Sequence, residues 1–450
     1  MKLKALALAV AAATVSTSAM SVEFNGYFRA GFGNTVGGGS QLCYGHGGPD
    51  SHVVGRLADE CDTYAEISLS QNVVERSNGE RFSIHTLVAY GTHEAPGNYV
   101  DGRGNSWQGI SGEGGGSLEN GPWGGARLAF REAYAKYRMA GGSELWAGNR
   151  YYGRKDIHIN DWYYVNGSGY GIGLDNITIG NGALAFAVRN AKWNDEFGGA
   201  DALEAFTATP IFDLRWNGVN VGMGSLDLIA NIGFVYASDA QEASEVDYND
   251  KTGVALTAEW TVGLSGGFNK LVAQYSTEGF AWAGYGMNNH LGDGYNAEAA
   301  QIGRKSWRIM DHGLYKFNRN VDMSWNVWYS QLHEDEGDTG KRYGFTVRPR
   351  YLWNNTMSTS LEVGYYSNED GWAPERSDLT KIAVSQNWSP LQEKGGFWAR
   401  PEIRVFLAHY MGDDETQRYW SDDNPEWGSW GTGTIKDRDT MIGAQVEAWW

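Results

Sequence analysis

The last ten residues of the chain, MIGAQVEAWW (441–450), alternate between two kinds of side chain. One set is apolar throughout and consists of Ile442, Ala444, Val446, Ala448 and Trp450. The intervening set is mixed and consists of Met441, Gly443, Gln445, Glu447 and Trp449. Because side chains of a β-strand point alternately to its two faces, this stretch predicts a strand with one apolar face. Such a strand fits the core of a soluble sandwich and also the lipid-facing wall of a membrane barrel.

The same alternation recurs in three other strand-sized segments. They are VEFNGYFRAGF (22–32), DTYAEISLS (62–70) and WARPEIRVF (398–406). Each has one uncharged, mostly apolar face and one face that mixes charged and aromatic residues. In a sandwich the mixed face would meet water, whereas in a large barrel it would line a lumen. A mixture of Arg, Tyr, Glu and Trp suits a sugar-binding lumen.

Polar, glycine-rich or acidic stretches separate the strand-like segments. The longest cover residues 33–51, 102–125, 333–340 and 413–437, and their composition predicts loops and turns. Allowing about ten residues per membrane strand plus connections, the chain accommodates strands in the high teens. No linker or internal repeat divides the sequence, so we expect residues 21–450 to form a single transmembrane β-barrel domain.

The first residues carry an export signal. Lys2 and Lys4 precede an apolar run and a small-residue stretch, which predicts a signal peptide over residues 1–20 with cleavage near 19–21. No later segment reaches 18 consecutive apolar residues and the mean hydropathy is −0.46, which excludes a helical membrane protein. The formal net charge of −18 disfavours nucleic-acid and anionic-lipid partners. Cys43 and Cys61 lie in one early segment of an exported chain, which favours a disulfide between them over two free thiols.

The stretch GSELWAGNRYYGRKDIHINDWYYVNGSGYGIGLDNI (142–177) resembles the maltoporin family of outer-membrane sugar channels at nearly every position. Other similar stretches follow along the mature chain, namely VEFNGYFRAG (22–31), RLADECDTYAE (56–66), FREA (130–133), GFNKLVAQYSTE (267–278), RIMDHG (308–313), FWARPEIRVF (397–406) and GAQVEAWW (443–450). The resemblance implies an all-β fold, an 18-stranded antiparallel transmembrane barrel with long outer loops, one of them folded into the lumen. It also implies a homotrimer in the lipid of the bacterial outer membrane that passes maltose and linear maltodextrins by passive diffusion.

The family uses an aromatic slide along the channel and a polar track beside it. Carried over to this sequence, the slide comprises Tyr27, Tyr64, Phe268, Trp398 and Trp449, together with Trp123 donated by the neighbouring subunit, for which Trp107 is a competitor. The polar track comprises Arg29, Arg56, Glu66, Arg131, Arg154, Asp156 and Asp161, and Tyr163 marks the constriction. Tyr27, Tyr64, Trp398 and Trp449 also fall on the mixed faces found from periodicity alone.

Other interpretations of these residues remain open at the level of sequence. The aromatics could belong to a membrane girdle, and the charged residues could set only ion preference. The competing functions are a related porin with a broader or different sugar preference and, less favoured, a secreted β-sandwich lectin or glycosidase. Glu66, Asp156 and Asp161 could in principle converge as catalytic carboxylates, but no metal, cofactor or nucleophile motif is present, and we expect no enzyme activity. Phages or a periplasmic sugar-binding protein are further expected partners.

Overall fold

The computed structural model describes the chain from Val22 to Trp450 with several gaps. The described residues are 22–37, 52–60, 62–93, 127–190, 210–235, 250–287, 291–292, 295, 297–334, 337, 339–369, 376–391, 396–412 and 438–450. The predicted signal peptide, both cysteines and the tryptophans at positions 107 and 123 lie outside these residues, so the predictions about them stay predictions.

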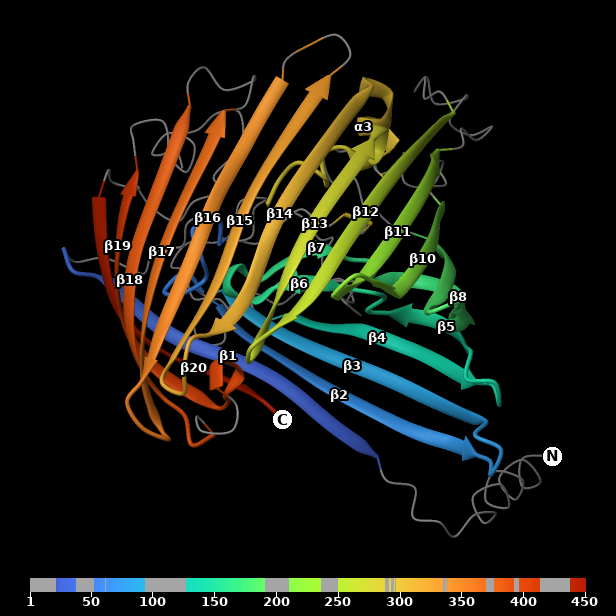
Figure 1. Ribbon diagram of the computed structural model, residues 1–450, viewed down its shortest axis with the longest axis horizontal. Helices are drawn as coiled ribbons and strands as arrows, with labels where there is room; N and C mark the ends of the chain where they lie inside the picture. Colours follow the sequence, from blue (N-terminus) through green and yellow to red (C-terminus); the bar gives the residue numbers. More distant parts are fainter. Residues whose placement is uncertain are drawn as a thin grey trace.

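Eighteen strands of the described chain pair antiparallel into one closed sheet (Figure 1). In chain order they are β1 (Glu23–Thr35), β2 (Asp62–Glu75), β3 (Arg81–His93), β4 (Arg127–Arg138), β5 (Glu144–Arg150), β8 (Gly169–Ile179), β9 (Gly182–Asn190), β10 (Pro210–Val221), β11 (Gly224–Val235), β12 (Lys251–Leu264), β13 (Gly267–Thr277), β14 (Arg304–Lys316), β15 (Val321–Glu334), β16 (Thr339–Leu352), β17 (Met357–Glu369), β18 (Ser377–Trp388), β19 (Glu402–Gly412) and β20 (Arg438–Trp449). The ring closes because β1 pairs with β2 on one side and with β20 on the other. The predicted 18-stranded barrel is confirmed.

The two ends of the barrel differ in the length of their connections. Gly180 and Asn181 alone join β8 to β9, and a two-residue turn that begins at Gly222 joins β10 to β11. Both glycines adopt positive φ angles of 61° and 60°, which a glycine reaches without a Cβ clash. Gly26 and Trp450 exchange backbone hydrogen bonds of 3.2 and 3.1 Å at this same end. Short turns face the periplasm in bacterial barrels, so both described termini lie at the periplasmic end.

One predicted strand begins later than the sequence pattern indicated. The alternation from Trp398 suggested a strand through residue 406, but β19 begins at Glu402. Trp398 instead lies in the 3₁₀ turn η3 (Gly396–Trp398) of the connection from β18 to β19. Pro401 explains the difference, because proline has no N–H to donate to a strand ladder. The predicted strand start at Trp398 was therefore wrong.

The predicted alternation of faces is confirmed along the wall. The apolar set points outward and is exposed, as shown by Phe24, Phe32, Ile67, Leu69, Ile403, Val405 and Ile442. The alternate set is buried inside the barrel, as shown by Arg29, Arg404, Gln445 and Glu447. An outward apolar band with a polar interior is the arrangement that a lipid bilayer requires of a barrel. No helix in the described ranges is long and apolar enough to cross a membrane.

Within the described residues, three segments fold into the barrel interior rather than one. The first, residues 151–168, contains β6 (Lys155–Ile157), η1 (His158–Asn160) and β7 (Trp162–Val165), and Figure 1 shows β6 and β7 inside the ring of strands. The second, residues 52–60, packs Val53 and Leu57 into the same buried cluster as wall residues of β17 and β18. The third, between β13 and β14, contains η2 (Glu278–Phe280) and α3 (Ala297–Ile302) and packs against β10 to β12. Sequence reasoning anticipated one inward loop, and the structure adds two.

Gly364 on β17 allows segment 52–60 to approach the wall closely. A Cβ atom at position 364 would lie 2.1 Å from the Val54 carbonyl oxygen and 2.7 Å from the Val54 Cα. We expect Gly364→Ala to lower the free energy of unfolding by about 1–3 kcal/mol, the usual cost of overpacking a filled site. Heat-dependent gel mobility of the detergent-extracted barrel measures this change. Gly263→Ala on β12 is the matched control, because a Cβ there meets no atom within 4 Å, and equal shifts for the two variants would contradict the prediction.

Candidate functional site

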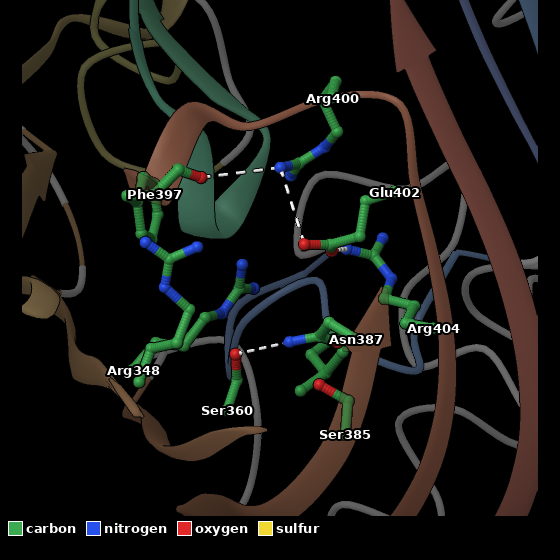
Figure 2. Close-up of a pocket in the computed structure, with 10 residues that line it drawn as sticks. Arg348, Ser360, Ser385, Asn387, Phe397, Arg400, Glu402 and Arg404 are labelled. Carbon is green, nitrogen blue, oxygen red and sulfur yellow. Dashed lines mark hydrogen bonds and ion pairs between the residues drawn. The ribbon is translucent and has the colours of Figure 1, made fainter. Parts of the chain in front are cut away.

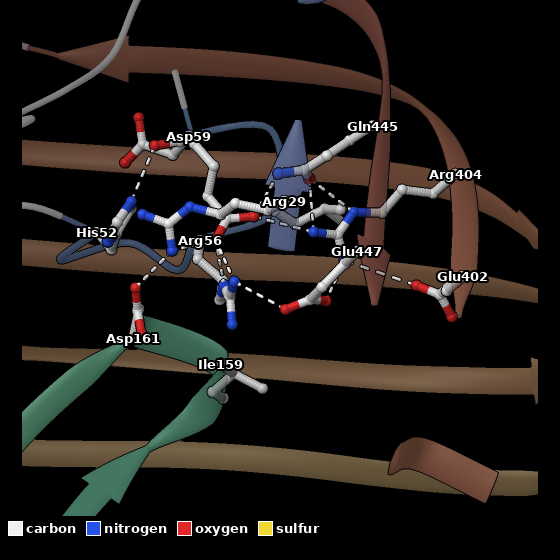
Figure 3. Close-up of polar contacts among 12 residues, drawn as sticks. Arg29, His52, Arg56, Asp59, Ile159, Asp161, Glu402, Arg404, Gln445 and Glu447 are labelled. Atoms are coloured by element: carbon white, nitrogen blue, oxygen red, sulfur yellow. Dashed lines mark hydrogen bonds and ion pairs between the residues drawn. The ribbon is translucent and has the colours of Figure 1, made fainter. Parts of the chain in front are cut away.

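A buried cluster of charges fastens the inward segments to the barrel wall. Glu60, at the end of segment 52–60, pairs with Arg56, with Arg29 at 3.2 Å and with Arg404 at 3.0 Å. Gln445 donates a further hydrogen bond of 2.6 Å to the same carboxylate. Figure 3 shows these side chains converging from β1, β19, β20 and the inward segment. Because each partner comes from a different part of the chain, the cluster fixes segment 52–60 in the lumen.

Glu447 on β20 forms the second centre of this cluster. Arg56 lies 2.9 Å from one of its carboxylate oxygens and Arg400 lies 2.7 Å from the other. The Tyr27 hydroxyl donates a 3.1 Å hydrogen bond to it. Burying an ionised carboxylate without partners is strongly unfavourable. These three contacts therefore allow Glu447 to remain ionised while it is buried in the lumen.

The guanidinium groups also set the charge state of the inward carboxylates. Burial alone would raise the pKa of Glu60, but Arg56 and Arg29 hold it below its ordinary value. Burial would likewise raise the pKa of Asp161, and again Arg56 and Arg29 lower it. Both carboxylates are therefore ionised at neutral pH, and Asp161 in segment 151–168 pairs with Arg29 at 2.9 Å. Arg29 of β1 thus connects segment 52–60, through Glu60, to segment 151–168, through Asp161.

A small pocket lies beside this cluster near the periplasmic end, lined by residues of β16 to β19 and by Leu57. Arg348, Arg400 and Arg404 point into it together with Glu402 (Figure 2). These arginines are already engaged with carboxylates of the protein, since Arg348 pairs with Glu362 on β17 and the other two contact Glu447. The cavity is therefore part of the packing that supports the inward segments.

Four of the predicted slide aromatics lie in one continuous strip. The Tyr27 ring lies 6.1 Å from the Tyr64 ring and 6.5 Å from the Trp449 ring, measured between centroids. His158 then bridges to the end of the strip, with its ring 6.0 Å from Trp449 and 5.0 Å from Trp398. Trp398 is 41% exposed, so part of its indole is open to the lumen. The strip leads along the inner wall towards the periplasmic end.

Phe268 lies apart from this strip. Its ring centroid is 6.0 Å from the His312 ring and 5.8 Å from the Lys270 Nζ atom. The ring also packs at the edge of the buried apolar cluster that contains Val53 and Leu57. The structure therefore places Phe268 on the wall formed by β13 and β14, without a described contact to the other four rings.

The predicted polar-track residues fall into three groups. Arg29, Arg56 and Asp161 belong to the buried charge cluster, where Arg56 is only 2% exposed and its donors are engaged. A second group forms around Tyr64, whose hydroxyl accepts a 3.1 Å hydrogen bond from Arg131 and donates one of 2.5 Å to Glu66. In the third group the Arg154 guanidinium carbon lies 3.8 Å from the centre of the Tyr163 ring. Asp156 is exposed in the lumen.

Several residues of the site were missed in the sequence. They are Glu60, Tyr151, His158, Arg400, Arg404 and Glu447. Their contacts join positions far apart in the chain, as when Arg56 and Glu447 meet across 391 positions. The only local signal was the charge on a mixed strand face, which marks a residue as inward but does not identify its partner. Among the described residues no group of three or more His, Cys, Asp or Glu side chains is arranged to hold a metal ion.

A closed 18-stranded barrel with an apolar exterior and a polar, partly filled lumen defines an outer-membrane porin. The LamB porin family model matches residues 22–450. A maltoporin of Hahella chejuensis (strain KCTC 2396) is 32% identical over 456 aligned residues that cover 100% of this chain and 98% of that protein. The chain belongs to the LamB porin family, whose members are channels and not enzymes.

Two solved structures, one of them an outer membrane channel, also align along most of the chain. The channel DcaP of Acinetobacter baumannii is 12% identical, with 97% of this chain and 99% of that chain covered and a TM-score of 0.48. OccAB1 of Acinetobacter baumannii is 9% identical, with 95% and 96% covered and a TM-score of 0.47.

Removing the charge of Glu60 tests the role of the buried cluster. We expect Glu60→Gln to lower the free energy of unfolding by about 3–5 kcal/mol, because it leaves buried guanidiniums without their counter-charge. Glu80→Gln is the matched control, since Glu80 pairs with Arg76 in a periplasmic turn where the arginine side chain is 68% exposed, and such a pair contributes less than about 1 kcal/mol. Thermal unfolding of the extracted barrel gives both values, and a Glu60 variant as stable as the control would contradict the assignment.

The inward segments should loosen at mildly acidic pH. Burial lowers the pKa of His52, and burial together with Arg56 lowers the pKa of His158 well below its ordinary value. As the pH falls, these histidines are protonated in the unfolded chain before they are protonated in the folded protein. The free energy of unfolding is therefore highest above about pH 6.5 and decreases as the pH drops below this value. We expect a lower unfolding temperature at about pH 5.5 than at about pH 8, and a smaller difference in His158→Gln. A pH-independent unfolding temperature would rule this out.

Proposed function

We propose that the protein is a trimeric channel of the bacterial outer membrane that passes maltose and linear maltodextrins by passive diffusion. The observation that carries the proposal is the strip from Tyr64 through Tyr27 and Trp449 to Trp398, which runs beside ionised side chains of the lumen. Membership of the LamB porin family and the similarity to a maltoporin support the same substrate class.

The chemistry of a glucose unit matches this arrangement. A glucose ring has apolar C–H faces, which aromatic rings hold through dispersion and hydrophobic contact. Its rim of hydroxyls needs hydrogen-bond partners, which arginines and carboxylates provide as charge-assisted bonds. Arg29 brings the two together, because its guanidinium carbon lies 5.3 Å from the Tyr64 ring centre while its Nη1 pairs with Asp161.

The length of the strip suits a linear oligomer. Successive rings about one sugar unit apart allow a chain to move by small steps, with one contact forming as another breaks. Transport needs occupancy that is favourable but easily reversed, and several weak sites meet this need better than one strong site. In the proposed trimer, a neighbouring subunit donates one further aromatic to the slide, for which Trp123 is preferred and Trp107 is the competitor.

A related channel with a broader sugar range is the second candidate. The glycine-rich stretch 102–125 favours it, because this stretch contains Trp107 and Trp123, the two candidates for the aromatic proposed to be donated between subunits. Conductance of the purified protein in a planar bilayer, with maltohexaose titrated in, distinguishes the two. The selective channel is supported if conductance increases in groups of three equal steps and is blocked saturably by maltohexaose but hardly by sucrose or trehalose. Equal block by all three sugars supports the broader channel. Conductance that ignores every sugar refutes both.

Replacing Trp398 tests the slide directly. We expect Trp398→Ala to weaken maltohexaose binding at least about fivefold, because an aromatic contact contributes about 1 kcal/mol. Open-channel ion conductance should change much less. Trp353→Ala is the control, because Trp353 is 60% exposed in a periplasmic turn and away from the strip. Unchanged affinity in the Trp398 variant would remove this residue from the slide.

A further inference from the structure

Tyr151 begins the inward segment 151–168 and is not among the residues predicted from sequence. Its backbone N–H donates a 2.8 Å hydrogen bond to Oε1 of Glu132 on β4, which fixes its position as the chain leaves β5. Its hydroxyl contacts Glu66, and its ring contacts Arg154 closely and Arg131 more distantly, with the Arg131 guanidinium carbon 5.7 Å from the ring centre. All three partners belong to the proposed polar track.

The hydroxyl contact orients Glu66. Tyr151 donates a 2.9 Å hydrogen bond to the Glu66 Oε1 atom, and the Tyr64 hydroxyl donates one of 2.5 Å to the same atom. Two donors on one oxygen restrain the carboxylate and leave its second oxygen, Oε2, outside both of these hydrogen bonds. A fixed carboxylate oxygen can accept a ligand hydroxyl without first losing side-chain freedom.

The ring contact holds Arg154. The guanidinium carbon of Arg154 lies 4.1 Å from the Tyr151 ring centre and 3.8 Å from the Tyr163 ring centre, so both rings pack on one cation. A guanidinium stacked on aromatic rings presents its N–H donors at the edge of its plane, since these donors lie within that plane. The buried Nε atom of Arg154 has no hydrogen-bond partner among the described residues, so ring packing rather than hydrogen bonding holds this part of the side chain.

We propose that Tyr151 is a positioning residue for substrate selectivity, which acts by holding Glu66 and Arg154 in the orientations that meet sugar hydroxyls at the constriction. The inference rests on the proposed function. Tyr151 links the end of the aromatic strip at Tyr64 to the constriction at Tyr163, through one carboxylate and one guanidinium. It contributes by keeping an acceptor, Glu66, and a donor, Arg154, fixed beside Tyr163.

Two substitutions separate its contacts. Tyr151→Phe removes the hydroxyl bond to Glu66 and keeps the ring on Arg154, whereas Tyr151→Leu removes both. We expect maltohexaose affinity to fall about threefold in Tyr151→Phe and about tenfold in Tyr151→Leu, in each case through a faster dissociation rate, as is usual for lost contacts. Current-noise analysis in planar bilayers measures the association and dissociation rates of the sugar. Open-channel conductance close to that of the wild type shows that the pore is folded. Tyr275→Leu is the matched control, because Tyr275 is 41% exposed on the outer face of β13.

A double variant tests whether the ring acts through Arg154. In an Arg154→Ala background, Tyr151→Leu should weaken binding no further than Tyr151→Phe does, because coupled residues are not additive. Fully additive losses, or a Tyr151→Leu channel that binds maltohexaose as tightly as the Tyr275→Leu control, would overturn the inference. A wild-type channel that no sugar blocks would instead overturn the proposed function, and with it the inference. A wild-type channel that maltohexaose blocks, with unchanged Tyr151 variants, overturns the inference alone.

Discussion

Pairing of β1 with β20 is the interaction on which the rest of the structure depends. Hydrocarbon offers no water to unpaired N–H and C=O groups, so a sheet crosses a bilayer only when its two edge strands pair with each other. The register of this pairing also decides what enters the lumen. Tyr27 pairs with Trp449 and Arg29 with Glu447, which places two rings and an opposite-charge pair side by side on the inner face. A shift of one residue would turn Tyr27 and Arg29 to the lipid while their partners stayed inside.

A barrel of this size encloses more space than the side chains of its wall can fill. The inward segments occupy part of it, and segment 52–60 is held by ion pairs and hydrogen bonds in addition to the apolar contacts of Val53 and Leu57. Lys381 donates a 2.9 Å hydrogen bond to the Leu57 carbonyl and pairs with Glu362 at the same distance, while Glu362 accepts the Leu57 N–H at 3.1 Å. Both backbone groups of Leu57 thus gain a wall partner in place of water. Buried ion pairs contribute little net stability but are costly to break, so they favour one arrangement of the loop over its alternatives.

The sequence was sufficient for the barrel and for the direction of most side chains, because period-two alternation depends only on local chain geometry. It was less informative where a proline interrupts the alternation, as at Pro401, and Trp398 reaches the strip from a turn instead of a strand. It could not pair Glu60 with Arg404, because the two residues are 344 positions apart and nothing in either strand pattern specifies the other. The four aromatics of the strip could be predicted as a set, since resemblance and periodicity both indicated them. Their order along the lumen required the structure.

The charged residues of the lumen serve two different tasks. The buried, paired residues hold the inward segments in place, and the exposed residues are left to meet a passing ligand. A passing ligand must meet groups that are already oriented, yet it must leave them easily. Arg56 and Glu60 are almost fully buried and hold the inward segments in place, so they have little capacity left for a ligand. Asp156 is exposed, and Arg154 is held by two rings, while its buried Nε atom has no hydrogen-bond partner within the described part of the chain. Rigidity is therefore supplied by the buried pairs, and the groups at the surface of the lumen can bind weakly without becoming disordered.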